Sequence, residues 1–291
     1  MKHIIKSSNS YRNIFEGREL TIATMHGKEL VIAPVVKEYL EVNTIIQKNL
    51  NTDSLGTFSG EIERKDDALT TLRKKCMMAL EVSGGDLVIG NEGSFGPHPS
   101  LFFVAANEEM MMLIDTKNNI EIVAKEISTK TNFAGEEIKS EKALKDFAKR
   151  VGFPDHGIIL KERKEAASGI FKGIRDWETL THGFRSIYKT NGKVYVETDM
   201  RAMHNPTRME VIKSCSIKLM ENISSVCTKC SWPGFVVKDV VSGLPCEICN
   251  MPTRSTLKHI YKCSKCAFVE ERLFPNSREK EDAMYCDFCN P

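Results

Sequence analysis

Apolar residues recur at two different spacings along the first 220 residues of the chain. Short alternating or continuous apolar runs predict β-strands, and apolar residues three or four positions apart predict the buried face of a helix. The strand pattern covers residues 19–23, 86–91, 110–115, 120–127 and 193–198. The helical pattern covers residues from about 30 to 40 and from 68 to 82, a stretch after Ser140, and a stretch from Thr207 onward. Strands that alternate with helices predict an α/β fold.

Turn and cap residues refine this prediction. The short segment Lys117-Asn118-Asn119 lies between two predicted strands and is too short for a crossover, so these strands must be antiparallel and the sheet mixed. Ser140 is placed to cap the helix that follows it. Thr207 and Glu210 match a capping box, in which each side chain accepts a hydrogen bond from a backbone N–H of the first turn. We therefore expect Arg208 to lie in the first turn of a helix.

The last fifth of the chain carries four Cys-x-x-Cys pairs. These are Cys227 and Cys230, Cys246 and Cys249, Cys263 and Cys266, and Cys286 and Cys289. Two intervening residues let both thiolates of a pair turn toward one ion, and two pairs complete a tetrahedral shell, so eight thiolates predict two structural zinc ions. The spacing of the pairs is that of zinc ribbons, and we expect pairing in sequence order, first with second and third with fourth. The shift in composition divides the chain into an α/β domain, 1–222, and a double zinc-ribbon domain, 223–291.

Other roles for these cysteines are less consistent with the sequence. Four disulfides would require an oxidising compartment, yet the segment Met1-Lys2-His3-Ile4-Ile5 does not begin an apolar run of signal-peptide length, so we expect zinc in a reducing cytoplasm. A redox pair usually opens a helix, whereas Pro233-Gly234 and Pro252 indicate loops. Cys76 and Cys215 lie on the apolar faces of predicted helices, where they are expected to be small core residues.

Composition limits the function classes. A chain of 291 residues with 41% hydrophobic and 27% charged residues is typical of about two globular domains, and it contains no apolar stretch long enough to cross a bilayer. A formal net charge of +2 does not by itself indicate a nucleic-acid partner, because such partners usually require a basic excess. Partners must therefore be inferred from local sites.

Two segments that follow predicted strands carry more polar chemistry than a sheet requires. The first, His26-Gly27-Lys28, puts a glycine and a cation between a strand and a helix, where backbone N–H groups and the helix dipole favour an anion such as phosphate. The second runs from Asn91 to Pro99 and includes Glu92, Ser94 and His98. We expect it to be a loop in which Glu92 binds Mg²⁺ and the backbone approaches a ligand.

Two further segments are candidates. Asp199 and Arg201 follow the predicted strand 193–198, and with Arg208 they offer one carboxylate and two guanidiniums for phosphate oxygens. The segment from Asp53 to Glu61 is either a hairpin turn or a substrate loop. Each segment also has a purely structural interpretation, since glycine-rich segments are commonly turns, a lone lysine is commonly solvated, and Asp199 can form an ion pair with either arginine.

Several motifs together resemble an uncharacterised bacterial domain family of unknown function, over nearly the whole chain. They are Ala23-Thr24-Met25-His26-Gly27-Lys28-Glu29, Thr52-Asp53 with Gly56-Thr57-Phe58-Ser59-Gly60-Glu61, Glu92-Gly93-Ser94-Phe95-Gly96-Pro97-His98-Pro99, Thr131-Asn132-Phe133, Glu197-Thr198-Asp199-Met200-Arg201-Ala202 and the Cys-x-x-Cys tail. This resemblance implies an architecture and a motif set but no activity.

The order of features also resembles, more distantly, the inosine-triphosphate pyrophosphatase and Maf-like superfamily, which hydrolyses non-standard nucleoside triphosphates with Mg²⁺. The matching positions are Thr24 to Lys28, the helix with Lys74 and Lys75, Glu92-Gly93, and Pro206-Thr207-Arg208. The chain departs from that pattern in having His26 in place of an asparagine and a single Glu92 in place of paired acids.

The second resemblance implies a magnesium-dependent nucleoside-triphosphate pyrophosphatase. In it, Glu92, Lys28 and Arg208 would be catalytic, with Glu61 or Asp53 completing the magnesium site. His26, Gly27, Ser94, His98, Asp199 and Arg201 would bind the nucleotide. Cations of this kind neutralise the phosphate chain, and a metal-bound carboxylate positions the attacking water.

The alternative is a non-catalytic module, in which the zinc tail binds nucleic acid or a protein and the α/β domain senses a ligand. Basic and aromatic residues near the third Cys-x-x-Cys pair favour it: Lys258, Lys262, Lys265, Arg272, Tyr261 and Phe268. Glu270, Glu271 and Asp287 dilute this positive charge. Salt-dependent nucleic-acid binding by the tail would distinguish the two hypotheses.

Overall fold

The computed structural model describes residues 9–47, 66–166 and 168–291. Its described residues form two compact units. The larger unit comprises Phe15–Met220, and the smaller combines Asn9–Ile14 with Glu221–Pro291. The long helix α5 (Pro206–Ser224) begins in the larger unit and ends in the smaller one.

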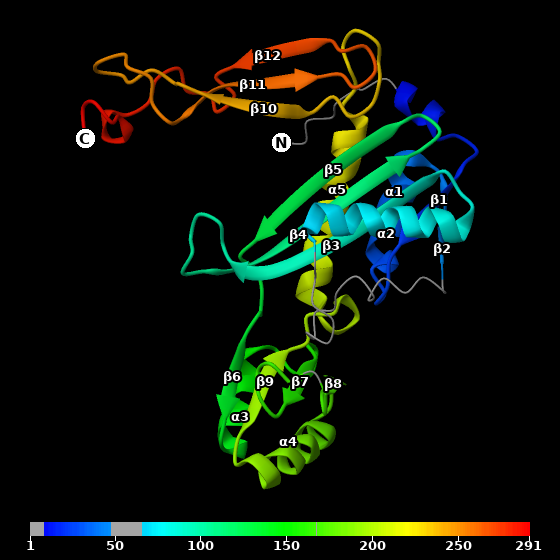
Figure 1. Cartoon of the computed structure of the whole chain (residues 1–291), viewed down its shortest axis with the longest axis vertical. Helices are drawn as coiled ribbons and strands as arrows, with labels where there is room; N and C mark the ends of the chain where they lie inside the picture. The colour runs from blue at the N-terminus through cyan, green and yellow to red at the C-terminus, as the bar shows by residue number, and fades with distance from the viewer. Residues whose placement is uncertain (1–8, 48–65, 167) are drawn as a thin grey trace. The chain divides into compact units, whose positions relative to one another are not determined.

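A five-stranded sheet forms the centre of the larger unit (Figure 1). Its strand order is β2-β1-β3-β4-β5, with bounds β1 (Glu19–Ala23), β2 (Asn43–Ile46), β3 (Leu87–Pro97), β4 (Ala105–Asp115) and β5 (Ile120–Ser128). Strand β1 pairs in parallel with β2 and β3, whereas β3, β4 and β5 form an antiparallel meander. The prediction of an α/β fold with a mixed sheet is therefore confirmed.

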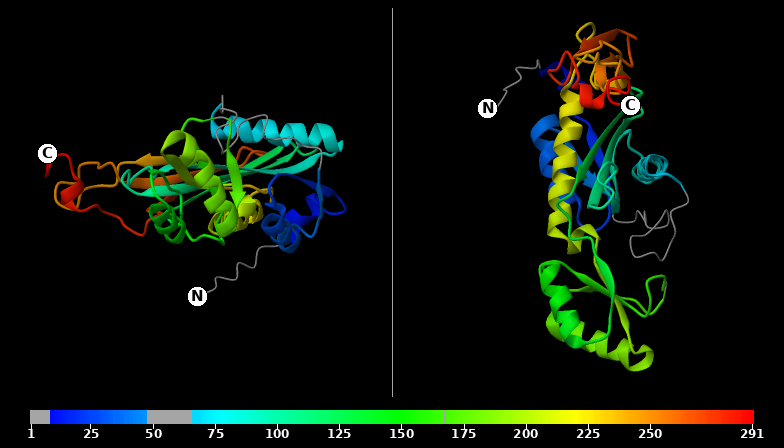
Figure 2. Two further views of the ribbon diagram at one scale, coloured as in Figure 1. Left: turned by 90° about the horizontal axis from the view of Figure 1, so that it is seen from below. Right: turned by 90° about the vertical axis from the view of Figure 1, so that its left-hand side faces the viewer.

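Helices cover both faces of this sheet. Figure 2 shows α1 (Glu29–Leu40) and α5 on one face and α2 (Ala68–Ser83) on the other. Leu72 and Cys76 of α2 pack against Val88 and Met112 of the sheet, and Cys215 of α5 is buried on the opposite face. Both cysteines are core residues, as expected from their place on the apolar helix faces.

A second sheet in the larger unit has the order β6-β9-β7-β8 and is antiparallel throughout. Its strands are β6 (Gly135–Ile138), β7 (Ile158–Lys161), β8 (Phe171–Ile174) and β9 (Val194–Thr198). Helices α3 (Glu141–Arg150) and α4 (Trp177–Asn191) bury Phe147 and Phe184 against it. The side chain of Ser140 accepts a hydrogen bond from the Ala143 N–H (3.2 Å), which confirms it as the cap of α3.

The smaller unit contains a three-stranded antiparallel sheet in the order β10-β11-β12 (Figure 1). Its strands are β10 (Val237–Ser242), β11 (Thr256–Lys262) and β12 (Val269–Leu273). Each strand connects two Cys-x-x-Cys segments or leads toward one, so the direction of the strands decides which cysteines meet.

Two local predictions are wrong. The segment from Asn91 to Pro97 is not a loop, because β3 continues to Pro97 and pairs residue by residue with β4 as far as Ala105. The capping box is also absent: α5 begins at Pro206, and the Asn205 Oδ1 atom accepts the hydrogen bond from the Arg208 N–H (2.9 Å). Asn205 therefore caps the helix two residues before the predicted cap at Thr207. Arg208 lies in the first turn, as expected.

Candidate functional site

The Cys-x-x-Cys segments have similar local backbone structures. The N–H of residue Ser231 donates to the Cys227 carbonyl (2.8 Å), and Asn250 and Asn290 donate to Cys246 and Cys286 in the same way. Ser231, Asn250 and the equivalent residue of the third segment, Ala267, have φ between 57° and 59°. The left-handed residue after the second cysteine turns the chain so that both thiols of a pair face the same side.

The eight cysteines gather into two groups of four. Cys227, Cys230, Cys263 and Cys266 form one, and Cys246, Cys249, Cys286 and Cys289 form the other, each with all sulfurs within 4.8 Å of one another. The Sγ–Sγ distances include 3.8 Å for Cys227–Cys266 and 3.6 Å for Cys249–Cys286. A tetrahedron with Zn–S bonds of about 2.3 Å has sulfurs about 3.8 Å apart, whereas a disulfide bond is about 2.05 Å long. Each group therefore has the dimensions of a structural zinc site.

The prediction of pairing in sequence order is wrong, and the sheet explains why. Strand β10 leads away from the first pair toward the second, and β11 returns antiparallel to it and ends directly before Cys263. The third pair thus lies at the end of the sheet where the first pair lies. Strand β12 reverses again, which takes the fourth pair to the second. In a meander of three strands of similar length, the first cysteine pair therefore meets the third, and the second meets the fourth.

Aromatic residues surround the first cysteine group. Phe235 is buried with Cys227 and Cys263, and its ring centroid lies 5.6 Å from that of Tyr261. Lys265 and Arg272 lie over aromatic rings, 4.0 Å from the centroid of Trp232 and 4.2 Å from that of Tyr261. These aromatic residues give the small unit a core that does not consist of metal ligands alone.

The second candidate site is a buried charge cluster in the larger unit. It consists of Lys28, Lys75, Glu92, Glu109 and Arg208, which are all less than a tenth exposed. Lys28 follows the turn at the carboxyl end of β1 and is the N-cap residue directly before α1, and its Nζ lies 3.5 Å from the carbonyl oxygen of Asn91 on the neighbouring strand β3.

Two ion pairs lie on opposite faces of β3. Glu92 points toward α2 and accepts a hydrogen bond from the Lys75 ammonium. On the other face, the Arg208 Nε donates to Glu109 Oε1 (2.8 Å), and Glu109 also accepts from the Asn91 side chain (3.1 Å). This separation follows from strand geometry, because consecutive side chains of a strand point to opposite faces.

Gly93 makes room for the second ion pair. A Cβ atom at Gly93 would lie 2.7 Å and 2.8 Å from the two carboxylate oxygens of Glu109 and would also collide with Arg208. Real Cβ atoms do not approach oxygens so closely, so this position of β3 requires glycine for close approach rather than for a turn. The prediction that this glycine belongs to a ligand-binding loop is therefore wrong.

The cluster carries one more positive than negative charge among its described members. Lys28, Lys75 and Arg208 are cations, and Glu92 and Glu109 are the carboxylates. Burial first, and then the nearby Arg208 guanidinium, lower the pKa of Lys28, and the carboxylates of Glu109 and Glu92 act in the opposite direction; together these effects bring the pKa from its ordinary 10.5 to about 7. Lys28 therefore changes its charge near neutral pH.

Other predicted site residues are held in structural contacts. Asp199 is fully buried and accepts from the Arg201 guanidinium (2.6 Å to Nη2) and from the Gly173 N–H (3.0 Å). Of the two arginines proposed as its partner, Arg201 is the one that pairs with it. Arg208 is linked to this turn, since its Nη1 donates to the Met200 carbonyl (2.6 Å).

Of the remaining predicted site residues, His26, Gly27 and Ser94 are close in sequence to Lys28 or Glu92, whereas His98 is not. His26 and Gly27 occupy the turn before Lys28 with φ of 67° and 76°. Ser94 is two residues beyond Glu92 on β3, but His98 lies about 20 Å along the strand direction. The His98 Nδ1 accepts from two backbone N–H groups of the following turn, so His98 organises that turn.

Magnesium does not fit the described residues. Glu92 is 3% exposed and its carboxylate is engaged by Lys75, a cation that competes with any metal. Asp53 and Glu61 lie outside the described residues. Among the residues that are described, the groups of three or more potential ligands are the two cysteine groups.

Glu109 was not identified from the sequence, and neither was the burial of Lys75. Glu109 directly precedes the predicted strand 110–115, so a strand beginning two or more residues earlier would have placed its carboxylate inside the sheet. Lys75 is buried because Glu92 compensates its charge. Sequence spacing does not reveal these ion pairs, because Lys75 and Glu92 are 17 positions apart and Glu109 and Arg208 are 99 positions apart.

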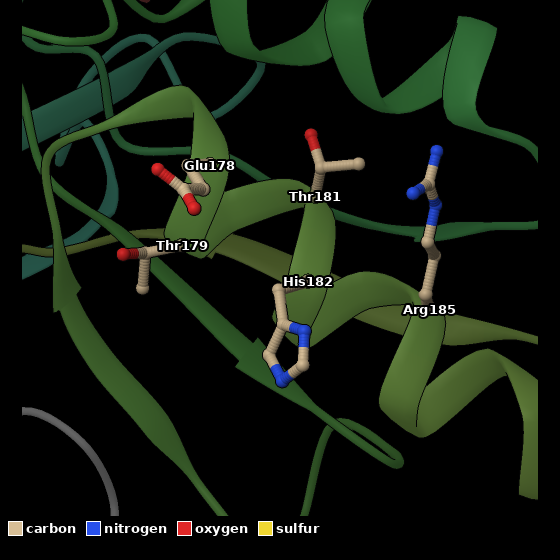
Figure 3. Close-up of a pocket in the computed structure, with 5 residues that line it drawn as sticks. All are labelled: Glu178, Thr179, Thr181, His182 and Arg185. Atoms are coloured by element: carbon tan, nitrogen blue, oxygen red, sulfur yellow. The ribbon is translucent and has the colours of Figure 1, made fainter.

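A surface depression on α4 differs from these two sites, because its polar side chains do not converge. It is lined by Glu178, Thr179, Thr181, His182 and Arg185. Figure 3 shows Thr181 and Arg185 pointing to one side of the helix and His182 to the other, so the polar groups diverge. Arg185 forms an ion pair with Glu141 (2.6 Å) at the surface.

Comparison with known proteins identifies the family. Residues 75–291 match a family described as a domain of unknown function (DUF6671), and the chain belongs to this family. The match includes Glu92, Glu109, Arg208 and both cysteine groups, whereas Lys28 precedes it. A comparison with curated proteins found no significant match. Within the part of the chain that the structure describes, every helix is too short or too polar to cross a membrane.

Proposed function

We propose that the chain binds the phosphate groups of a nucleotide at the buried charge cluster and hydrolyses a phosphoanhydride bond there. The observation that carries this proposal is Lys28, a buried ammonium at the start of α1 in a cluster with excess positive charge. Burying a charge without full compensation costs free energy, and natural proteins retain such groups at sites that bind a ligand of opposite charge.

An anion would satisfy the cluster in two ways. It would balance the positive charge that Lys28 adds to the two ion pairs, and it would lie near the amino end of α1, where the helix dipole favours negative charge. Only the protonated form of Lys28 attracts the anion, so the affinity is expected to fall as the pH rises above about 7, the pKa of Lys28.

The proposed hydrolysis uses the same residues. The oxygen of a water molecule bonds to phosphorus, and the bridging oxygen departs with the electrons of the broken P–O bond. Lys28 has a pKa near 7, so its ammonium can protonate the departing oxygen, and it regains a proton from solvent as the attacking water loses one. Arg208 adds positive charge near the phosphates.

The test measures binding and turnover with the same variants. Zinc-loaded protein is titrated with nucleoside triphosphates at pH 6.5 and 8.5, and release of phosphate and pyrophosphate is followed with and without Mg²⁺, using standard and deaminated bases. Lys28→Met is expected to abolish both signals, because it removes the charge but keeps a long apolar stem. Lys37→Met is the matched control, since Lys37 lies on the exposed side of the same helix. Equal behaviour of the two variants would refute the proposal.

Nucleic-acid binding by the tail is a second candidate. Lys265 over Trp232 and Arg272 over Tyr261 favour it, because aromatic and cationic groups together bind single strands. However, Arg272 pairs with Glu270 and Lys258 pairs with Glu271, both at 2.7 Å, which reduces the positive charge of this surface. Binding of a labelled oligonucleotide that weakens steeply with salt and with Lys265→Ala would support this function.

A further inference from the structure

Two aromatic side chains lie beside the buried charge cluster. The rings of Phe95, on β3, and Phe133, in the segment between β5 and β6, are stacked with centroids 5.6 Å apart and an interplanar angle of 28°. The Arg208 guanidinium lies 5.2 Å from the centroid of Phe95. Phe133 remains 43% exposed, so one aromatic residue of the stack faces solvent.

The backbone around Phe133 is held on both sides. The Asn132 side chain donates to the Val151 carbonyl (2.9 Å), and its oxygen accepts from Asn205 (2.9 Å), the residue that caps α5. On the other side, the Ala134 N–H donates to the Thr198 hydroxyl (3.2 Å). Asn205 thus fixes both the start of the helix that carries Arg208 and the segment that carries Phe133. An exposed ring on so constrained a backbone is pre-organised for contact with a ligand.

The distance along β3 matches the length of a nucleotide. Lys28 contacts β3 at Asn91, and Phe95 lies four residues further along, about 13 Å at the usual rise of a strand. Gly93 and the Arg208–Glu109 pair lie between them. Because the buried Arg208–Glu109 pair fills this face of the strand, a molecule with phosphates at one end and a flat ring at the other would pass over the pair to reach both Lys28 and Phe133.

We propose that Phe133, supported by Phe95, is the surface on which the base of the bound nucleotide stacks. This inference rests on the proposed function, since it assigns the other end of the same ligand. A stacked ring offers its π-face to any base, so Phe133 contributes affinity for the base without reading its edge. The ligand class is therefore a nucleoside polyphosphate rather than an inorganic polyphosphate.

Two probes separate this inference from the proposed function. Isothermal titration calorimetry on the zinc-loaded full chain compares inorganic tripolyphosphate, which has no base, with whichever of ATP and inosine triphosphate binds the wild type more tightly. The variants are Phe133→Ala, Phe133→Trp and Phe102→Ala. Phe102 is a control for the loss of an exposed aromatic ring, because it is 80% exposed in the segment between β3 and β4.

We expect Phe133→Ala to weaken nucleotide binding between about five-fold and about a hundred-fold, the usual range for one stacked base, without changing the affinity for tripolyphosphate. Phe133→Trp should retain nucleotide affinity, and Phe102→Ala should behave as the wild type. If Phe133→Ala changes both ligands equally or neither, the stacking surface is wrong while the phosphate site stands. If the wild type binds neither probe, the proposed function fails and this inference fails with it.

Discussion

Replacing Lys28 by methionine is expected to stabilise the larger unit strongly at neutral pH. In the unfolded chain Lys28 is solvated and has its ordinary pKa of 10.5, whereas burial lowers the pKa to about 7 in the folded state. Folding therefore removes a proton from Lys28 or desolvates its charge, and either costs free energy. Methionine has a similar length and lacks the charge, so the variant does not pay this cost.

The size and the pH dependence of the effect follow from the two pKa values. The cost is fully present below about pH 7 and disappears as the pH approaches 10.5, because the unfolded state then also loses the proton. Linkage gives a cost of about 4 kcal/mol at pH 7 and about 2 kcal/mol at pH 9. The gap in unfolding free energy between Lys28→Met and the wild type should shrink accordingly.

The assay can report on the larger unit alone. The chain has two tryptophans, Trp177 in the larger unit and Trp232 in the zinc-binding tail. In a Trp232→Phe background, the fluorescence of Trp177, whose ring packs edge-on at 4.8 Å from that of Phe153, follows unfolding of the larger unit in urea. Zinc is kept saturating, so any pH effect on the cysteines is common to both proteins and cancels in their difference.

The control variant sets the criterion for rejection. Lys37→Met changes the charge by the same amount on the exposed side of α1, so its unfolding free energy should stay close to that of the wild type at both pH values. A gap for Lys28→Met that is equal at pH 7 and pH 9, or no larger than that of Lys37→Met, would show that Lys28 is not a buried cation in the folded protein.

Two further predictions concern the cysteine groups and the glycine at the ion pair. The double variant Cys227→Ser with Cys263→Ser removes two ligands from one group and should retain one zinc ion per chain by elemental analysis, whereas Cys227→Ser with Cys246→Ser should retain none; the opposite pattern would support sequence-order pairing. Gly93→Ala should lower the unfolding free energy in the Trp177 assay by about 3 kcal/mol through collision with the ion pair, while Gly96→Ala, which has open space around it, should change it by less than about 1 kcal/mol.

Elements with a strong local signal could be predicted from the sequence. Strand β1 has the predicted bounds, and α2 ends within one residue of the prediction, because apolar periodicity and caps are encoded in neighbouring residues. The eight cysteines of the two groups were also identified, since Cys-x-x-Cys spacing is a local property. Their grouping was not, because it depends on how three strands reverse.

Among the charged residues too, those with a local sequence signal were predicted and those placed by the tertiary structure were not. Lys28, Glu92 and Arg208 were selected because glycines or helix starts stand beside them, and the structure brings them into one cluster. Glu109 and the burial of Lys75 were missed, because only the register of β3 with β4 and the packing of α2 place them there. The glycine-rich segment after Glu92 was predicted as a loop, although it is part of β3 and Gly93 makes room there for the side chains of Glu109 and Arg208.

The interleaved grouping of the cysteines sets an order for assembly during synthesis. In the first group, Cys230 and Cys263 are separated by 33 residues, and the second pair is synthesised between them. A nascent chain that has reached Cys249 holds two half-sites and no complete one, so no zinc ion can be fully coordinated until β10 and β11 have both emerged. The loops closed by the two cysteine groups overlap at β11, so the first group encloses β10 and β11 and the second encloses β11 and β12. Strand pairing brings alternate cysteine pairs together. Complete coordination of zinc is therefore coupled to formation of the sheet.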